Sequence, residues 1–160
     1  NISSWDLSLD GASELNTYLN ASPDVYYFSY TFSATSKDEV TGYHTPNKDV
    51  FLLIRSRAKL LGSRIVFTNS GSETDSTWWE NDGIVNSRSM RGPTTGQNGP
   101  DRIVKYQPSG LLMKGQWYTF EPIKLDHYQS VGHMLSNEKR KILDSTYINH
   151  AKLLWSLPKD

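Results

Sequence analysis

The chain has 160 residues, and its 17 Lys and Arg balance its 17 Asp and Glu, so its formal net charge is zero. This length suits one ordinary domain with its own core, and we expect residues 1–160 to form a single unit. The mixed charges give no basic patch for nucleic acid or an anionic membrane, and no apolar run approaches the roughly 20 residues of a transmembrane segment.

Cysteine is absent, which excludes disulfides, thiolate nucleophiles and zinc–thiolate sites within the chain. Two N-glycosylation sequons begin at Asn1 and Asn20, and the second precedes a Ser-Pro-Asp turn of the kind found on surfaces. Sequons also arise by chance, so they agree with a secreted glycoprotein without requiring one. Aromatic residues make up 12% of the chain, which suits an extracellular hydrolase and a carbohydrate-binding β-domain about equally.

The first predicted elements are a helix and a strand. Apolar residues at helical spacing predict an amphipathic helix over residues 7–20, with Ser8 or Asp10 as its cap. The aromatic and β-branched run over residues 25–32 predicts a strand buried on both faces. A helix that feeds an almost continuously apolar strand is typical of an α/β layered fold.

Two more helices and one more strand follow. Residues 50–61 fit a helix that Gly62 would end, and residues 117–123 predict a second strand. Residues 137–157 predict a C-terminal helix with Asn137 as its cap. Much of the apolar face of that helix comes from Ile142, Tyr147, Ala151, Leu154 and Trp155.

Among the four histidines, His127 is the strongest candidate for chemistry. It follows the predicted strand 117–123 by a short linker, and the carboxyl ends of strands are where open α/β sheets place catalytic groups. His150 lies in the predicted C-terminal helix and is expected to be structural, whereas His44 lies in a turn with no carboxylate beside it. For each of them the plain alternative is a surface or hydrogen-bonded structural residue.

Asp82 lies in an Asn-Asp-Gly sequence, which is typical of a turn in which Gly83 takes a positive φ. That turn alone would explain the aspartate. A loop aspartate followed 45 residues later by His127 also has the chain order of the acid and base in an α/β-hydrolase triad. The nucleophile elbow Gly-x-Ser-x-Gly is missing, since residues 92–96 read Gly-Pro-Thr-Thr-Gly, and in hydrolase order the serine would lie upstream of Asn1.

Several stretches together resemble one known family. They are "WDLSLDGASELN", "ASPDVYYFSYTFSAT", "TGYHTPN", "ENDGIVNSRSM" followed by "GP", "DRIVKY", "KGQW", and "DH" with "VG" soon after. Their order is similar to that in secreted lipases of the staphylococcal and thermoalkaliphilic Bacillus type, from Trp5 to roughly the end of the chain. The resemblance implies the C-terminal portion of an α/β-hydrolase fold, a mostly parallel sheet flanked by helices that needs an N-terminal half to complete it.

By this resemblance Asp82 corresponds to the triad acid and His127 to the triad base. The serine, oxyanion hole and lid belong to the family's N-terminal portion. The implied reaction is hydrolysis of triacylglycerol esters through an acyl-enzyme, by a secreted lipase of which this is a processed chain or a fragment. The expected partners are a serine-bearing segment or chain and a lipid ester, and this chain alone is expected to be inactive.

The resemblance also concerns metals, although no cofactor is required for the triad. Asp6 resembles an aspartate that joins a zinc site with ligands farther upstream, while a carboxylate at a helix start is an equally good explanation. The family's calcium ligands are altered here, because Gln129 stands two places after the base and Met134 stands in the turn after "VG", where acidic residues are expected. Hard cations need several carboxylate oxygens, so we expect no calcium site.

Two alternatives remain beside the lipase interpretation. One is a non-catalytic storage, structural or ligand-binding protein on a lipase-derived scaffold, which the altered metal positions allow. The other is a self-standing carbohydrate-binding domain, which predicts an all-β structure.

Overall fold

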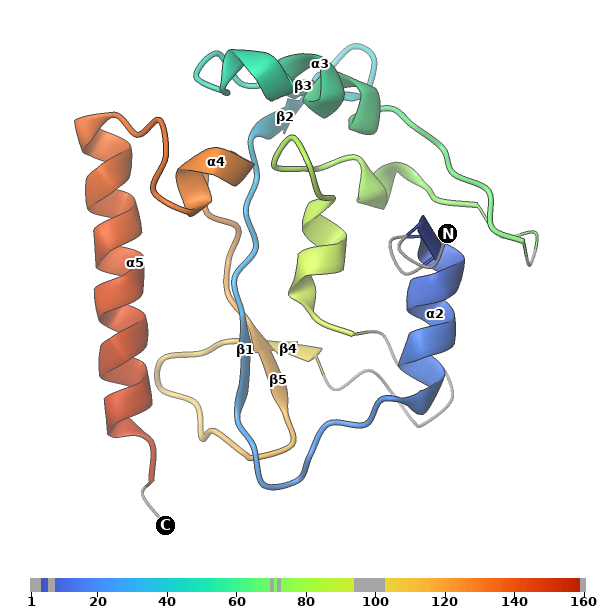
Figure 1. Cartoon of the computed structure of the whole chain (residues 1–160). Helices are drawn as coiled ribbons and strands as arrows, with labels where there is room; N and C mark the ends of the chain where they lie inside the picture. The colour runs from blue at the N-terminus through green and yellow to red at the C-terminus, as the bar shows by residue number, and fades with distance from the viewer. Residues whose placement is uncertain (1–3, 6–7, 70, 72, 94–102, 159–160) are drawn as a thin grey trace.

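The structure is a computed structural model that describes residues 4–5, 8–69, 71, 73–93 and 103–158. In Figure 1 a short sheet lies between two helical flanks, with α5 along one side, α2 on the other, and α3 beside a small hairpin at the top. The elements in chain order are α2 (Leu9–Tyr18), β1 (Tyr27–Ser29), β2 (Thr35–Lys37), β3 (His44–Pro46), α3 (Leu52–Leu61), the 3-10 helices η1 (Ser76–Trp78) and η2 (Ser87–Arg91), β4 (Ile103–Lys105), β5 (Trp117–Thr119), α4 (His127–Ser130) and α5 (Asn137–Ser156).

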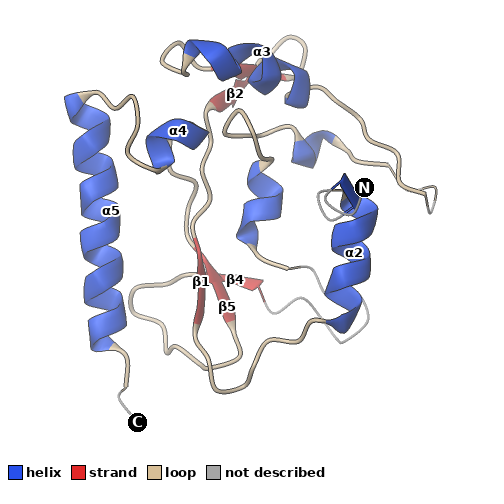
Figure 2. Cartoon of the chain, viewed as in Figure 1, coloured by secondary structure: helices blue, strands red, loops and turns tan. Residues whose placement is uncertain are grey.

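The main sheet is parallel and has the order β1-β5-β4, with β5 in the centre (Figure 2). Tyr27 pairs with Trp117 in register, and their rings stack with centroids 4.8 Å apart. A parallel bridge between Phe32 and Ile123 continues this pairing beyond the strands. The fold is therefore a partial α/β fold, as expected. The segments that contain β1 and β5 stay side by side as far as Phe32 and Ile123, just before residues 125–127.

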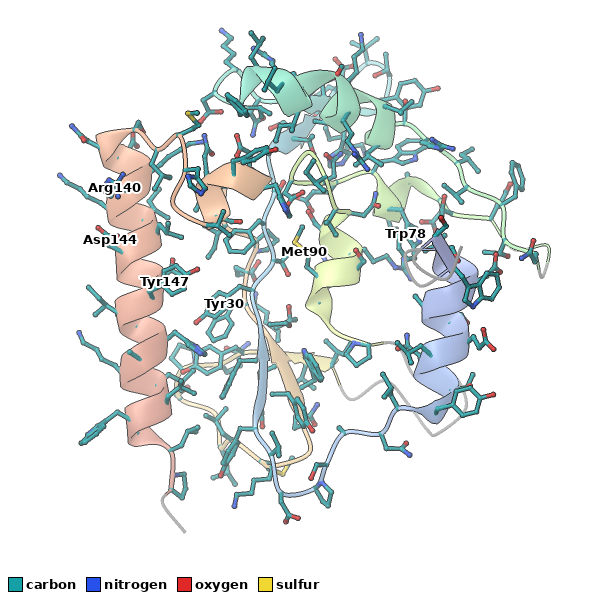
Figure 3. All side chains as sticks on the ribbon, in the orientation of Figure 1. Tyr30, Trp78, Met90, Arg140, Asp144 and Tyr147 are labelled. Atoms are coloured by element: carbon teal, nitrogen blue, oxygen red, sulfur yellow. The ribbon has the colours of Figure 1, made fainter. Side chains whose placement is uncertain are left out.

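The predicted strand over residues 25–32 is shorter than expected and is not enclosed. Regular pairing covers three residues of β1, and the aromatic side chains of Phe28, Tyr30 and Phe32 are only half-buried. The order of the sheet leaves β1 at its edge among the described residues, with a neighbour on one side only. On one face β1 meets α5, where Tyr30 and Tyr147 both point into the space between them (Figure 3).

The helices follow the local sequence patterns closely. Ser8 caps α2, because its Oγ accepts a hydrogen bond from the backbone N–H of Gly11 at 3.0 Å. Gly62 ends α3, as predicted. The predicted cap of α5 was wrong by one residue: Ser136 is the cap, with an extended backbone and a side chain that accepts from the N–H of Lys139. Substantial helix excludes the all-β carbohydrate-binding alternative.

The apolar face of α5 is less covered than the sequence pattern predicts. Leu143 is its buried residue, whereas Tyr147 and Trp155 are 59% and 77% exposed. Among the described helices, none combines the length and apolar character that crossing a membrane requires.

Three short strands were not predicted from the sequence. Strands β2 and β3 form an antiparallel pair, which places His44 in a strand and corrects its assignment to a turn, and β4 pairs with β5. Three residues are too few to show an alternating pattern. Beneath α3, the buried residues Ala34, Val50 and Ile54 form a core cluster with Phe51 and Ile84 packed against it. This cluster lies next to the loop of Asp82.

Candidate active site

Asp82 and His127, 45 residues apart in sequence, lie in direct contact. Nδ1 of the His127 imidazole is 2.8 Å from Oδ2 of Asp82. The backbone N–H of His127 also donates to the backbone carbonyl of Asp82 at 3.0 Å. The two segments are thus joined at both backbone and side chain, and the structure brings the two predicted site residues together.

The carboxylate of Asp82 is held rigidly in the interior. Its side chain is 2% exposed. One oxygen, Oδ1, accepts hydrogen bonds from the backbone N–H groups of Ile84 and Val85 at 2.9 and 2.8 Å, which leaves Oδ2 for His127. A buried charge needs such partners, and here two backbone amides and an imidazole provide them.

The residues on either side of Asp82 hold it in place. The side chain of Asn81 is fully buried, donates to the carbonyls of Ala58 and Trp79 at 3.1 and 2.9 Å, and accepts from the N–H of Gly83 at 2.9 Å. Gly83 has a φ of 99°, as the turn prediction requires, and a Cβ there would lie 2.7 Å from Cδ1 of Ile54. The motif is therefore both a turn and a support for the carboxylate.

His127 is the first residue of a one-turn helix, α4, and not part of a loop as predicted. Asp126 caps this turn: its Oδ1 accepts from the N–H of Gln129 at 2.9 Å, and Oε1 of Gln129 accepts from the N–H of Asp126 at 3.0 Å. The other oxygen of Asp126 accepts from the N–H of Phe51 at 2.8 Å. The role of Asp126 was missed, although its spacing from Gln129 is the signal of a capping box.

The imidazole of His127 is oriented for proton transfer. Its contact with Asp82 uses Nδ1, so a neutral ring that donates from Nδ1 presents Nε2 as an acceptor. The side chain is 43% exposed, so the ring is open to a group from outside the described residues. This arrangement can accept a proton from a hydroxyl and stabilise the resulting imidazolium.

The other histidines with described contacts have structural partners. Nδ1 of His44 lies 3.3 Å from Oγ1 of Thr35, and burial lowers the pKa of His44 below its ordinary value. Nδ1 of His150 lies 3.1 Å from the hydroxyl of Tyr30. The second contact agrees with the structural role expected for His150.

Of the remaining predicted site residues, those that the structure describes have no side-chain hydrogen bond to Asp82 or His127. Asp6 and Asn1 lie outside the described residues, and Asn20 is exposed just after α2. Gln129 is buried, whereas Met134 is exposed. Within residues 4–5, 8–69, 71, 73–93 and 103–158, no three His, Cys, Asp or Glu side chains gather to hold a metal ion.

Comparisons with known proteins agree on one family. A lipase of Staphylococcus hyicus is 26% identical over 148 residues, covering 92% of this chain and 21% of the relative. Among solved structures, EstA from Clostridium botulinum has a TM-score of 0.74 and 37% identity, over 88% of this chain and 32% of that one. Lipase 1 from Pelosinus fermentans has a TM-score of 0.68 and 28% identity, over 97% of this chain and 39% of that one.

The chain therefore spans about a fifth of the S. hyicus lipase, about a third of the C. botulinum chain and about two fifths of the P. fermentans chain. The family model described as "Lipase-like, C-terminal domain" matches residues 1–152. With a partial parallel sheet and a match over nearly its whole length, the chain belongs to the family of lipase-like C-terminal domains.

Proposed function

We propose that this chain provides the acid, Asp82, and the base, His127, of a serine hydrolase that cleaves the carboxylic esters of triacylglycerols. The observation that carries the proposal is the 2.8 Å contact between Nδ1 of His127 and a buried carboxylate oxygen. The serine belongs to a segment outside residues 1–160, either in the same polypeptide or on a partner chain. The chain by itself is inactive in this proposal.

The geometry supports one proposed role for each of the two residues. Nε2 of His127 takes the proton of the serine hydroxyl as the oxygen attacks the ester carbonyl, and returns it to the leaving alcohol. Asp82 holds the ring in the tautomer that leaves Nε2 free, and its charge stabilises the imidazolium. Water then attacks the acyl-enzyme with the same base and releases the fatty acid.

Within the described residues, the unpaired edge of strand β1 is evidence for a partner segment that carries the serine. Strand β1 is paired with β5 only, so no described strand pairs with the backbone of its other edge. An unpaired strand edge is a template for another strand. We propose that the serine-bearing segment adds a parallel strand beside β1, which brings its nucleophile toward His127.

Location and modification are further parts of the proposal. We propose that the chain is secreted, and the exposure of Asn20 within a sequon makes it a glycosylation site in a eukaryotic secretory pathway. Asp6 is proposed as a zinc ligand completed from upstream.

The proposal is tested by joining the chain to the N-terminal segment of a lipase of this family that contains the Gly-x-Ser-x-Gly serine. Hydrolysis of a triacylglycerol emulsion and of a soluble p-nitrophenyl ester is then measured. We expect activity that Asp82→Asn reduces by about 10⁴-fold and His127→Ala by about 10⁶-fold, the order of loss seen when a serine hydrolase loses its triad acid or base. His133→Ala is a matched control, because this exposed histidine lies six residues after His127 and should leave the rate unchanged.

Full activity of either triad variant would refute the assignment. An assembled, correctly folded protein that contains the serine but hydrolyses neither substrate would instead favour the non-catalytic alternative, a binding or storage protein on this scaffold. Circular dichroism and size-exclusion chromatography of the assembled protein distinguish this result from misfolding.

A further inference from the structure

A lysine lies beneath the turn that carries His127. Lys139 is in the first turn of α5, and its side chain is 14% exposed. Its Nζ lies 2.6 Å from Oε1 of Gln129 in α4 and 2.5 Å from Oδ2 of Asp49, which precedes α3. One ammonium group therefore links three segments that are far apart in the sequence.

The same glutamine connects Lys139 to the turn that begins at His127. Oε1 of Gln129 accepts from both the ammonium of Lys139 and the backbone N–H of Asp126, and its Nε2 donates to the carbonyl of Asp49 at 3.1 Å. Since an ammonium only donates, its contact requires that the oxygen of the amide, and not the nitrogen, face Lys139 and Asp126. Lys139 thereby selects the side-chain orientation that closes the capping box around His127.

The acceptors around the ammonium of Lys139 are one amide oxygen and one carboxylate. Oε1 of Gln129 and the carboxylate of Asp49 both face the ammonium. The hydrogen bond from Lys139 to Asp49 is the main reason that the pKa of Asp49 falls below its ordinary value. A calcium ion fits these residues poorly, because it needs several carboxylate oxygens and would be repelled by the lysine. The ammonium of Lys139 is therefore the positive charge at this position.

We propose that Lys139 is a positioning residue, an internal cation that holds α4 in place so that His127 meets Asp82. It acts through Gln129 and Asp126 and contacts neither the imidazole nor a substrate. Its importance for catalysis rests on the proposed function, whereas its effect on the His127–Asp82 hydrogen bond can be measured without any reaction.

The test uses NMR of the full chain, alone and joined to the serine-bearing segment. The Nδ1 proton of His127, hydrogen-bonded to a carboxylate, gives a resonance at low field that serves as the signature of the pair. In Lys139→Met, which keeps an apolar side chain of similar length, we expect this resonance to be lost by broadening. Amide exchange at Gln129 should become about tenfold faster, because its capping bond opens more often.

Two further variants separate positioning from general stability. Lys139→Arg keeps the positive charge and should restore the resonance. Lys105→Met is the matched control: it breaks the exposed ion pair of Lys105 with Glu121 and should leave the resonance and the exchange unchanged. A Lys139→Met protein that keeps the wild-type resonance and exchange rate would overturn the proposal, as would the same loss in Lys105→Met.

Thermal unfolding with and without calcium tests the proposal independently and needs no variant. With the cation site filled by Lys139, the Tm should be the same in millimolar calcium chloride and in a chelator. A Tm that rises with calcium and falls back on chelation would refute the role of Lys139 as the internal cation. Neither this result nor the NMR result depends on ester hydrolysis, so failure of the proposed function would be seen separately.

Discussion

Replacing Gly83 with alanine tests how tightly the turn of Asp82 is built. Gly83 has a φ of 99°, in a region that costs an alanine about 1–2 kcal/mol. The new methyl would lie 2.7 Å from Cδ1 of Ile54, well inside the roughly 3.5–4.0 Å of an ordinary carbon contact. Overpacking of this kind costs about 1–3 kcal/mol.

Together these terms predict that Gly83→Ala lowers the free energy of unfolding by roughly 2–5 kcal/mol. At about 2–4 °C per kcal/mol for a chain of this size, the Tm should fall by roughly 4–20 °C in a calorimetric scan. Gly42→Ala is the matched control, since Gly42 also has a positive φ, 73°, but nothing lies within 4 Å of the added methyl. Gly42→Ala should therefore lower the free energy of unfolding only by the cost of the backbone conformation.

A double variant separates the contact with Ile54 from the backbone cost. Ile54→Val removes Cδ1, so Gly83→Ala should cost less in that background than in the wild type, by about 1 kcal/mol or more. Equal losses for Gly83→Ala and Gly42→Ala, with no coupling to Ile54, would refute the reasoning that the Asp82 turn is packed against α3.

Two other predictions concern the support of His127. Asp126→Ala removes both the cap of α4 and the acceptor for the N–H of Phe51, and we expect a loss of about 2–4 kcal/mol in denaturant unfolding. Asp75→Ala, which removes an exposed cap, should cost clearly less, and equal losses would contradict the assignment. Asp49 has a pKa that its bond to Lys139 lowers, so the folded state binds fewer protons here than the unfolded state near the ordinary value of about 3.9. Its stabilising contribution is therefore complete above that pH and is lost as the pH falls through the lowered pKa. Asp49→Asn should lower the Tm at pH 7 and flatten its decline below about pH 4, whereas a decline identical to that of the wild type would show that Asp49 contributes nothing to it.

Much of the candidate site could be predicted because its residues carry strong local signals. The Asn-Asp-Gly sequence predicts a turn with a positive φ at Gly83, and that conformation is present. The position of His127 after a predicted strand pointed to the carboxyl end of the sheet. The capping box of Asp126 and Gln129 was also visible in the sequence and was overlooked.

Other features could not be predicted because they depend on distant partners. The sequence around Asn81 does not indicate that its side chain is buried and bonded to Ala58 and Trp79. An asparagine before Asp-Gly is also typical of an exposed turn. The link from Lys139 to Asp49 joins residues 90 positions apart. Strands of three residues are defined by the partner that supplies their hydrogen bonds and not by their own pattern.

The sequence by itself determined the helices of residues 9–18, 52–61 and 137–156 and the backbone of the Asp82 turn, because helical periodicity and dihedral preference act over a few residues. Only the tertiary structure decided that β5 lies between β1 and β4, that Asp82 is buried, and that His127 donates to it. Those contacts arise when segments far apart in the chain close around a shared core. Burial and pairing then depend on every segment that packs there, and no local pattern encodes them.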